Sequence, residues 1–301
     1  MHLPSEASLL EYVEKNVDVL EDELHNAGEQ WRQLRRRGKD LCFGQYCTHA
    51  RLMEIAPEAF SQVRTILNIH QVGTVHLDIF SIRRAIQNVF IAGMGTSTLY
   101  GVAGAYDMFQ DNLTAAEVGV GATICGTVAG IIALIASPKR KRGGHYDYRK
   151  RLIRIGLHRE AVIPEITAHE YTHHIQKEHL KMTPIERASP LIEGPARLVG
   201  GIVARNFAER TNNPAHVYHY VRRVAKELTN AYVQLCRRKR MKPKKNLLRE
   251  QTYLNLLLGF NEKGFGNYYD TGTAVMKIAT AKNGQHILEQ VTKNDFSFLE
   301  K

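Results

Sequence analysis

The chain has 301 residues, of which 44% are hydrophobic and 24% are charged. This balance is typical of a globular protein, and it excludes a collagen, a largely disordered chain and a small disulfide scaffold. Lys and Arg number 41 against 30 Asp and Glu, and this positive net charge predicts an anionic neighbour such as lipid headgroups or nucleic acid.

The four cysteines, Cys42, Cys47, Cys125 and Cys236, are few and mostly far apart. This usage is typical of a reducing compartment and not of a disulfide framework. The first residues, Met-His-Leu-Pro-Ser-Glu, lack a basic stretch followed by an apolar run, so we expect no cleaved signal peptide. Cys42, Cys47 and His49 lie close together, but without a second ligand pair they are a weak zinc signal.

Residues 6–37 are predicted to form one long amphipathic helix. Its apolar residues alternate at spacings of three and four from Leu10 to Leu34, which is the seam pattern of a coiled coil. Ser5 can cap the start of this helix. Two interpretations stay open: the helix packs on its own domain, or it joins two chains as an intermolecular coiled coil that forms a homo-oligomer. We expect further short helices in the rest of the N-terminal helical region, 1–84.

Two apolar, glycine-rich segments follow, residues 85–106 and 118–137. Neither contains Asp, Glu, Lys or Arg, and each has the ~20 residues needed to cross the hydrocarbon core of a bilayer. Residues 85–137 are therefore predicted to form a hairpin of two transmembrane helices. Basic residues flank the hairpin on both sides, so the positive-inside rule places the N- and C-terminal domains in the cytoplasm. The alternative is a glycine-rich helical hairpin buried in a soluble protein.

A domain of mixed composition is predicted from residue 143 to residue 301. It opens with a strand-like run from Leu152 to Leu157 and continues as helices. With the helical N-terminal region, this predicts an α+β chain that is mostly helical. The basic run Arg237–Lys245 is expected to be a solvated loop, or to bind anionic lipid at about 1 kcal/mol per charge. Nucleic acid is a poorer fit as a partner because no aromatic residues alternate with the basic ones.

The pattern His169-Glu170-x-x-His173 lies inside an apolar-periodic stretch that predicts a helix. Two histidines four residues apart project from one face of a helix, where they can occupy two corners of a zinc tetrahedron. Glu170 between them is placed to act as general base toward a metal-activated water. We therefore predict a zinc site, with His174 as a surface group or a neighbour that supports the ligands.

Two residues compete for the third ligand position, Glu193 and His179. Glu193 follows His173 by 20 residues and can approach on a second helix. His179 follows it by six residues, a spacing that works only if the helix breaks, yet Gln176, Lys177 and Glu178 between them favour a continuous helix. Glu193 is the favoured ligand.

The sequence Ala-His-Glu-Tyr-Thr-His-His-Ile-Gln at 168–176 and the later Glu193-Gly194-x-Ala196 resemble the two active-site helices of the gluzincin metallopeptidases, in the thermolysin-like branch. The resemblance covers about residues 143–301. It implies a zincin-like fold with a short edge-strand sheet and two active-site helices, and a Zn²⁺ cofactor. It also implies a strand, here 151–157, that binds a protein or peptide substrate as an added strand, and a Tyr-x-x-Gly helix in which Tyr269 donates to the transition state.

Two residues depart from the pattern of this family. Pro195 disfavours helical geometry beside the proposed ligand, so it is expected to start or kink the second helix. Arg197 stands one turn after Glu193, where many relatives have an acid that orients a ligand histidine. We therefore expect that support to come from Glu165 or Asp270.

The leading hypothesis is a membrane-tethered zinc metallopeptidase with a catalytic domain in the cytoplasm. One alternative is a soluble metalloprotease that acts on nucleic-acid-associated proteins, which the positive charge and the His179 spacing favour. Another is a membrane or coiled-coil scaffold with a structural zinc site. This one is disfavoured because structural zinc sites are usually closed by four ligands that are rich in cysteine.

Overall fold

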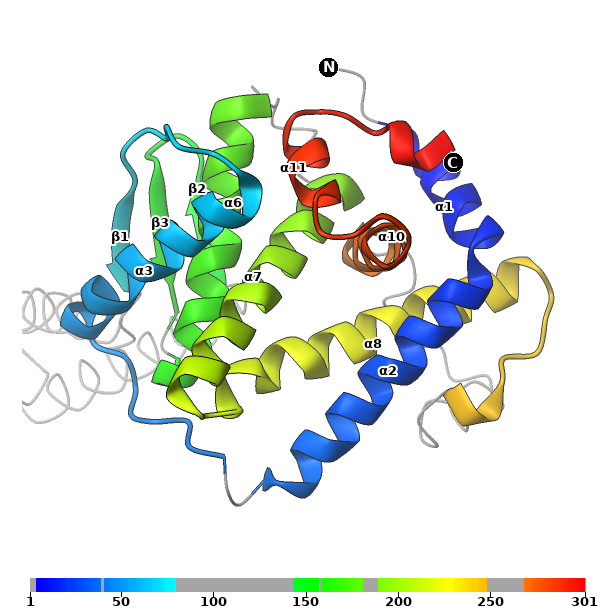
Figure 1. The fold of residues 1–301 in the computed structure, drawn as a ribbon, viewed down its shortest axis with the longest axis horizontal. Helices are drawn as coiled ribbons and strands as arrows, with labels where there is room; N and C mark the ends of the chain where they lie inside the picture. The colour runs from blue at the N-terminus through cyan, green and yellow to red at the C-terminus, as the bar shows by residue number, and fades with distance from the viewer. Residues whose placement is uncertain are drawn as a thin grey trace, which may run out of the picture. The chain divides into compact units, whose positions relative to one another are not determined.

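The computed structural model describes residues 4–38, 41–79, 143–156, 158–180, 189–247 and 268–300 (Figure 1). The chain forms two compact units, and almost all of the described residues belong to one of them, Met1–Asp78 with Gly144–Lys301; the other is Ile79–Gly143. The described α-helices are α1 Glu6–Lys15, α2 Val17–Arg36, α3 His49–Leu67, α6 Ile163–Leu180, α7 Pro190–Thr211, α8 Ala215–Arg238, α10 Tyr268–Asn283 and α11 Ile287–Thr292. The strands are β1 His76–Ile79, β2 Gly144–Asp147 and β3 Leu152–Ile155, and short 3-10 turns occur at Glu160–Val162, Lys245–Leu247 and Ser297–Glu300. The prediction of a mostly helical α+β chain is confirmed.

The N-terminal amphipathic segment is two helices, and not the single helix predicted for 6–37. The break falls at Asn16, whose side-chain amide donates to the backbone oxygen of Tyr12 at 2.8 Å and accepts from Lys282 Nζ at 2.8 Å. An asparagine that bonds to the backbone in this way competes with the helical hydrogen bonds. A distant lysine therefore helps to fix the end of α1.

The apolar seam of α2 packs on α8 of the same chain, as the two long helices side by side in Figure 1 show. Its buried residues are Leu20, Leu24, Ala27, Trp31 and Leu34. The first of the two interpretations, packing within the domain, therefore describes this seam. A homo-oligomer through the N-terminal helix stays a prediction, and it would have to use a different face of α2.

The segment after α2 differs from the short helices that we predicted there. It contains one 19-residue helix, α3, which packs on α6, and then strand β1. Thr48 caps the start of α3 by accepting from the Arg51 N–H at 3.2 Å. Pro57 inside α3 does not end the helix.

The sheet has three strands in the order β1-β3-β2, and β2 pairs with β3 in antiparallel register, with Tyr146 opposite Ile153. The predicted strand at 151–157 is therefore the central strand of the described sheet and cannot accept an added strand there. Strand β1, which pairs with the other side of β3, was not predicted from the sequence. The edge that faces the site helix α6 belongs to β2.

Helix α7 packs against α10 more closely than ordinary side chains allow. A Cβ atom added to Gly194 on α7 would lie 2.4 Å from the backbone oxygen of Gly272 on α10. A Cβ added to Gly272 would lie 2.3 Å from the backbone oxygen of Pro190. Such distances are shorter than any normal contact, so only glycine fits at these two positions.

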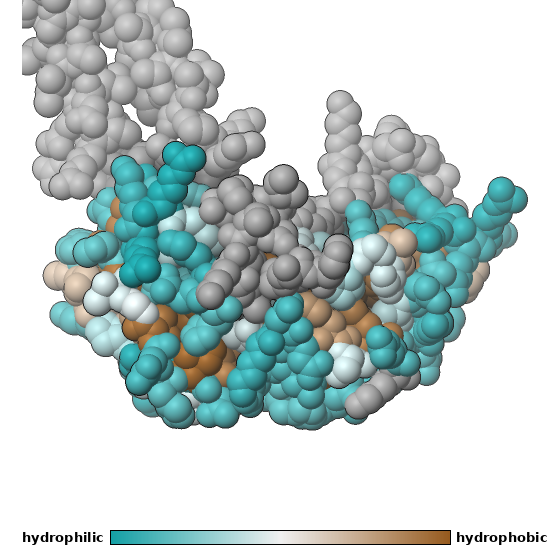
Figure 2. All heavy atoms as spheres, turned by 90° about the horizontal axis from the view of Figure 1, so that it is seen from above, coloured by the Kyte–Doolittle hydropathy of each residue, from teal (hydrophilic) through white to brown (hydrophobic). Residues whose placement is uncertain are grey.

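The predicted transmembrane hairpin at 85–137 lies outside the described residues. Among the helices that the structure does describe, none combines the length and the apolar character needed to cross a bilayer. The face in Figure 2 is mainly hydrophilic where residues are described, with hydrophobic areas bordered by hydrophilic side chains. The basic run Arg237–Lys245 is partly paired, since Arg238 contacts Glu14 at 3.0 Å and Lys244 contacts Glu21.

Candidate metal centre

Helix α6 carries both histidines of the predicted metal site, and it is buried around its whole circumference from Ile163 to Gln176. It follows directly on a 3-10 turn, and Pro164 lies in its first turn, where the missing N–H has no helical partner to lose. The apolar residues among the histidines place this helix in the interior. His169 and His173 are therefore largely buried, as predicted, and need polar partners.

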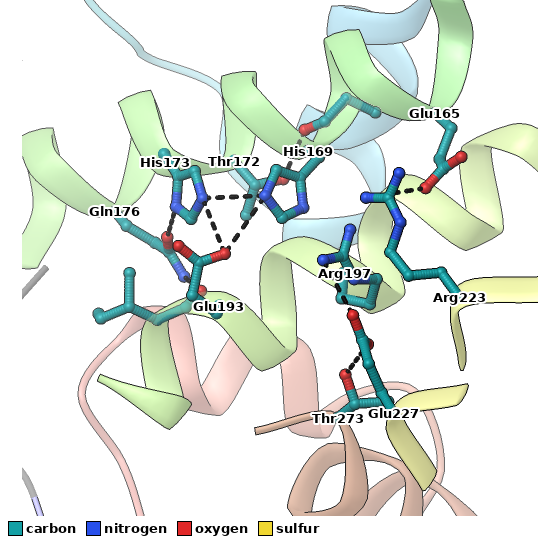
Figure 3. Close-up of polar contacts among 12 residues, drawn as sticks. Glu165, His169, Thr172, His173, Gln176, Glu193, Arg197, Arg223, Glu227 and Thr273 are labelled. Atoms are coloured by element: carbon teal, nitrogen blue, oxygen red, sulfur yellow. Dashed lines mark hydrogen bonds and ion pairs between the residues drawn. The ribbon is translucent and has the colours of Figure 1, made fainter. Parts of the chain in front are cut away.

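Helix α7 brings Glu193 to these histidines. Ser189 caps this helix, because its Oγ accepts from the Leu191 N–H at 3.3 Å, and the cap places Glu193 in the first turn. Glu193 Oε2 lies 3.3 Å from His169 Nε2 and 3.4 Å from His173 Nε2, and the two Nε2 atoms are 3.1 Å apart (Figure 3). The three ligand atoms lie within 4.8 Å of one another, so this group could hold a metal ion.

The orientation of His173 follows from a hydrogen-bond chain. Gln176 Nε2 donates to the backbone oxygen of Ile192 at 2.9 Å, which turns Gln176 Oε1 toward His173 Nδ1, also at 2.9 Å. An amide oxygen only accepts, so Nδ1 of His173 carries the proton and Nε2 keeps its lone pair for a metal. His169 Nδ1 has no such partner among the described residues.

The group also fits a cation electrostatically. Burial lowers the pKa of His169 to about 3, so its imidazole is neutral at pH 7. Burial alone would raise the pKa of Glu193, but the neighbouring His173 outweighs it and holds the pKa well below its usual range. In the metal-free protein burial lowers the pKa of His173, while Glu193 outweighs it and raises that pKa. An anionic carboxylate beside two imidazoles is a donor set suited to a divalent cation.

Glu170 lies between α6 and strand β2. A Cβ added to Gly144 would lie 2.5 Å from Glu170 Cγ, so the absent side chain makes room for this carboxyl. Burial raises the pKa of Glu170 to about 7, although a hydrogen bond from the Tyr146 backbone N–H lowers it. A carboxyl poised near neutral pH can both take and return a proton.

His174 is fully buried and connects the sheet to α6. The Tyr146 hydroxyl is 2.7 Å from His174 Nδ1, and the backbone oxygen of Gly73 accepts from His174 Nε2 at 2.9 Å. The Nε2 proton fixes the tautomer, so Nδ1 accepts from the tyrosine. His174 is therefore a supporting residue and not a surface group. Its two partners could not be predicted, because Tyr146 lies on a strand and Gly73 in a loop, both outside the motif.

Arg197 does not contact the ligands through a hydrogen bond. Its Nη2 lies 3.2 Å from Glu227 Oε1 on α8, and its guanidinium carbon is 5.7 Å from the ring centre of Tyr269 on α10. Glu165, proposed from the sequence as a support for a ligand histidine, is buried and lies 3.8 Å from Arg223 Nη1. Asp270 bonds to Asn230 at 3.3 Å. Neither acid hydrogen-bonds to a ligand histidine.

The other sequence-based candidates lie elsewhere. Helix α6 continues through His179, which is exposed and lines a different pocket beside His70, so the structure brings Glu193 and not His179 to the histidine pair. Pro195 lies inside α7 and does not start it. Among the described residues, the cluster at Cys42 and Cys47 forms no metal group.

Three further side chains that could donate to a transition state, His216, His219 and Tyr220, lie on α8. His216 bonds to the backbone oxygen of Ala161 at 2.9 Å, His219 packs its ring near Phe43, and Tyr220 packs on Gly201. None of the three belongs to the metal group found among the described residues. Comparison with known proteins gives no relative to set beside this site: no protein-family model matches the chain, and no curated protein or solved structure shows significant similarity to it.

Proposed function

We propose that this chain is a zinc-dependent metallopeptidase of the gluzincin type. The observation that carries the proposal is the convergence of His169, His173 and Glu193 next to Glu170, a carboxyl that does not belong to the ligand group. Three nitrogen and oxygen ligands with a fourth position open are typical of catalytic zinc, whereas structural zinc has four protein ligands and favours cysteine. This donor set disfavours the structural scaffold.

Zinc held by the three ligands would supply Lewis acidity, which activates a water and polarises a peptide carbonyl. Glu170 accepts the proton of the attacking water and then transfers it to the leaving amine. In the metal-free protein its pKa is raised to about 7, so both protonation states are populated at neutral pH. Tyr269 on α10 donates to the developing oxyanion.

The substrate class follows from strand β2. Its outer edge faces α6, and the Tyr146 backbone N–H already bonds to Glu170 there. An extended peptide that pairs with this edge would pass beside Glu170, and main-chain pairing accepts many side-chain sequences. We therefore assign proteins or peptides in extended conformation as substrates, with β2 taking the part that the sequence suggested for residues 151–157.

Tethering to a membrane through residues 85–137, with both flanking domains in the cytoplasm, is part of this proposal. The supporting observation is that residues 85–106 and 118–137 contain no Asp, Glu, Lys or Arg, and the basic run Arg237–Lys245 would favour anionic lipid. The alternative with nucleic-acid-associated substrates relied partly on His179, which lies apart from the metal group. Resistance of the full chain to carbonate extraction tests the tether, and recovery in the supernatant without detergent contradicts it.

The central experiment compares Glu170→Gln with wild type for zinc content and for cleavage of casein or a quenched peptide library. Glu170→Gln should retain about one zinc per chain and lose ~10²-fold or more in turnover. Glu178→Gln is the matched control, because Glu178 also lies on α6 but pairs with Arg151 at 3.2 Å, away from the ligands. Loss of zinc in Glu170→Gln, or unchanged turnover, would refute the proposed role of Glu170.

A further inference from the structure

Arg197 lies in the interior with only 5% of its surface exposed, one turn after Glu193. Its one ion pair is with Glu227, and its Nε and Nη1 atoms have no hydrogen-bond partner among the described residues. Moving a guanidinium out of water is unfavourable, and a single carboxylate offsets only part of that cost. Packing alone therefore does not explain an arginine at this position.

The contacts of Arg197 link three helices, α7, α8 and α10. Arg197 on α7 pairs with Glu227 on α8, and Glu227 Oε2 accepts from Thr273 Oγ1 on α10 at 2.6 Å (Figure 3). Thr273 lies four residues after Tyr269, so both project from the same face of α10. The guanidinium carbon of Arg197 lies over the Tyr269 ring, 5.7 Å from the ring centre, so α10 also contacts Arg197 directly. That distance is within the range of a cation–π contact.

We propose that Arg197 is a positioning residue, which fixes the ring of Tyr269 relative to the ligand Glu193. The inference rests on the proposed function, in which Tyr269 is the transition-state donor. A donor must be held to within about 0.5 Å of its productive position. Tyr269 is half-buried in the first turn of α10, and the Arg197 guanidinium is a contact to its ring. The planar guanidinium covers the ring face, and Glu227 holds the guanidinium.

This assignment explains the departure from the family pattern. An acid one turn after the ligand glutamate would orient a histidine, whereas Arg197 points its charge toward α8 and α10. The same helix turn then supports the transition-state donor instead of a metal ligand. Lysine cannot replace this arginine fully, because an ammonium group has no planar face to lie over the ring.

The kinetic test is a double-mutant cycle on zinc-loaded full-length protein. Tyr269→Phe should lower kcat ~10-fold or more with little change in KM. Arg197→Met should lower kcat by a similar factor at unchanged zinc content. Tyr269→Phe made in Arg197→Met should then lower kcat by less than about twofold further, because a misplaced hydroxyl contributes nothing. Arg197→Lys should give an intermediate kcat.

The second test measures stability, and it requires neither bound metal nor peptidase activity. Urea unfolding midpoints of metal-free Arg197→Met, Tyr269→Leu and the double variant should be non-additive, because the two side chains touch. Arg197→Met can fail to fold, since it leaves Glu227 buried without its partner; Arg197→Met with Glu227→Leu then replaces it, because removing both charges avoids that penalty. Arg210→Met is the matched control, since Arg210 also lies on α7 and pairs with Glu58 on α3.

The outcomes separate the two proposals. Active wild type with additive kinetic effects, or additive unfolding midpoints, overturns the role of Arg197 while the peptidase proposal stands. A zinc-loaded wild type that cleaves no peptide overturns the proposed function, and with it the catalytic meaning of the Arg197 contact. Arg210→Met should change kcat by less than about twofold, and an effect equal to that of Arg197→Met also overturns the inference.

Discussion

Two helix contacts in the same compact unit are built in opposite ways. Between α2 and α8, large side chains fill the space, and the rings of Trp31 and Tyr218 meet with centres 5.0 Å apart. Between α7 and α10, the backbones themselves touch at Gly194 and Gly272. The first contact is a conventional hydrophobic seam, whereas in the second the two backbones leave no room for a side chain at either glycine.

The two contacts differ in how readily they tolerate a changed side chain. A seam of leucines can adjust to a new side chain by a change of rotamer, because no backbone is in contact. Backbones in contact cannot adjust in this way. Of the side chains beside the contact on α7, Glu193 reaches His169 on α6 and Arg197 reaches Glu227 on α8. The glycine contact therefore sets how closely α7, which carries Glu193, packs on α10.

The largest expected effect comes from the ligand that α7 supplies. Glu193→Ala should reduce bound zinc from about one ion per chain to a level below detection, because two imidazoles alone hold the ion weakly. His179→Ala should keep the metal, since His179 lies apart from the ligands. Metal analysis after dialysis measures both. The reverse pattern would place the protein among all-histidine metal sites.

The next effect contrasts the two helix contacts directly. Gly272→Ala should lower the free energy of unfolding by about 3 kcal/mol or more, because its methyl group would meet the backbone oxygen of Pro190. Leu24→Met in the seam should lower it by less than about 1.5 kcal/mol, since it conserves volume. Urea unfolding compares them. Equal losses would mean that the glycine contact relaxes as readily as the seam.

A smaller effect is expected at Gln176, which orients His173. Gln176→Ala should weaken zinc binding about 10–100-fold, the range seen when such a supporting hydrogen bond is removed. Gln62→Ala is the control, because Gln62 makes a similar side-chain bond to Asn206 far from the ligands. Competition with a chromogenic chelator gives the affinities. Unchanged affinity in Gln176→Ala would show that the Gln176 contact is dispensable.

The smallest effect is a pH dependence at Asp270. Burial and Glu227 raise its pKa to about 7, whereas an unfolded aspartate titrates near ~3.9. Between pH ~3.9 and pH 7 the Asp270 carboxyl is protonated in the folded state but ionised in the unfolded state. Its contribution to the free energy of unfolding is therefore fully present at low pH and is lost as the pH rises toward 7. Asp270→Asn should therefore be more stable than wild type by about 1 to 2 kcal/mol at pH 8.

The Asp270→Asn advantage should shrink at pH 5.5, where most wild-type molecules carry the proton. Urea unfolding at the two pH values measures this. The same difference at both would show that Asp270 does not titrate in this range.

The sequence predicted those features that depend on local spacing. The seam of α2 and the histidine face of α6 follow from helical periodicity, and Glu193 followed from the length of chain between two helices. The break at Asn16 could not be predicted, because it involves Lys282 near the other end of the chain. The contacts of Arg197 could not be predicted either, because no spacing in the sequence indicates that Glu227 and Tyr269 lie next to it.

The sheet determines where the second compact unit is inserted. The His76 N–H donates to the Arg151 oxygen at 2.8 Å, so β1 starts beside the start of β3, while Gly144 at the start of β2 lies opposite Ile155 at its end. Ile79 and Gly144 therefore lie at the same end of the sheet, on either side of β3 and about 10 Å apart. A flexible linker of about five residues can span that gap. Replacing the intervening chain with such a linker would leave intact the helices α6 and α7, which hold the metal ligands.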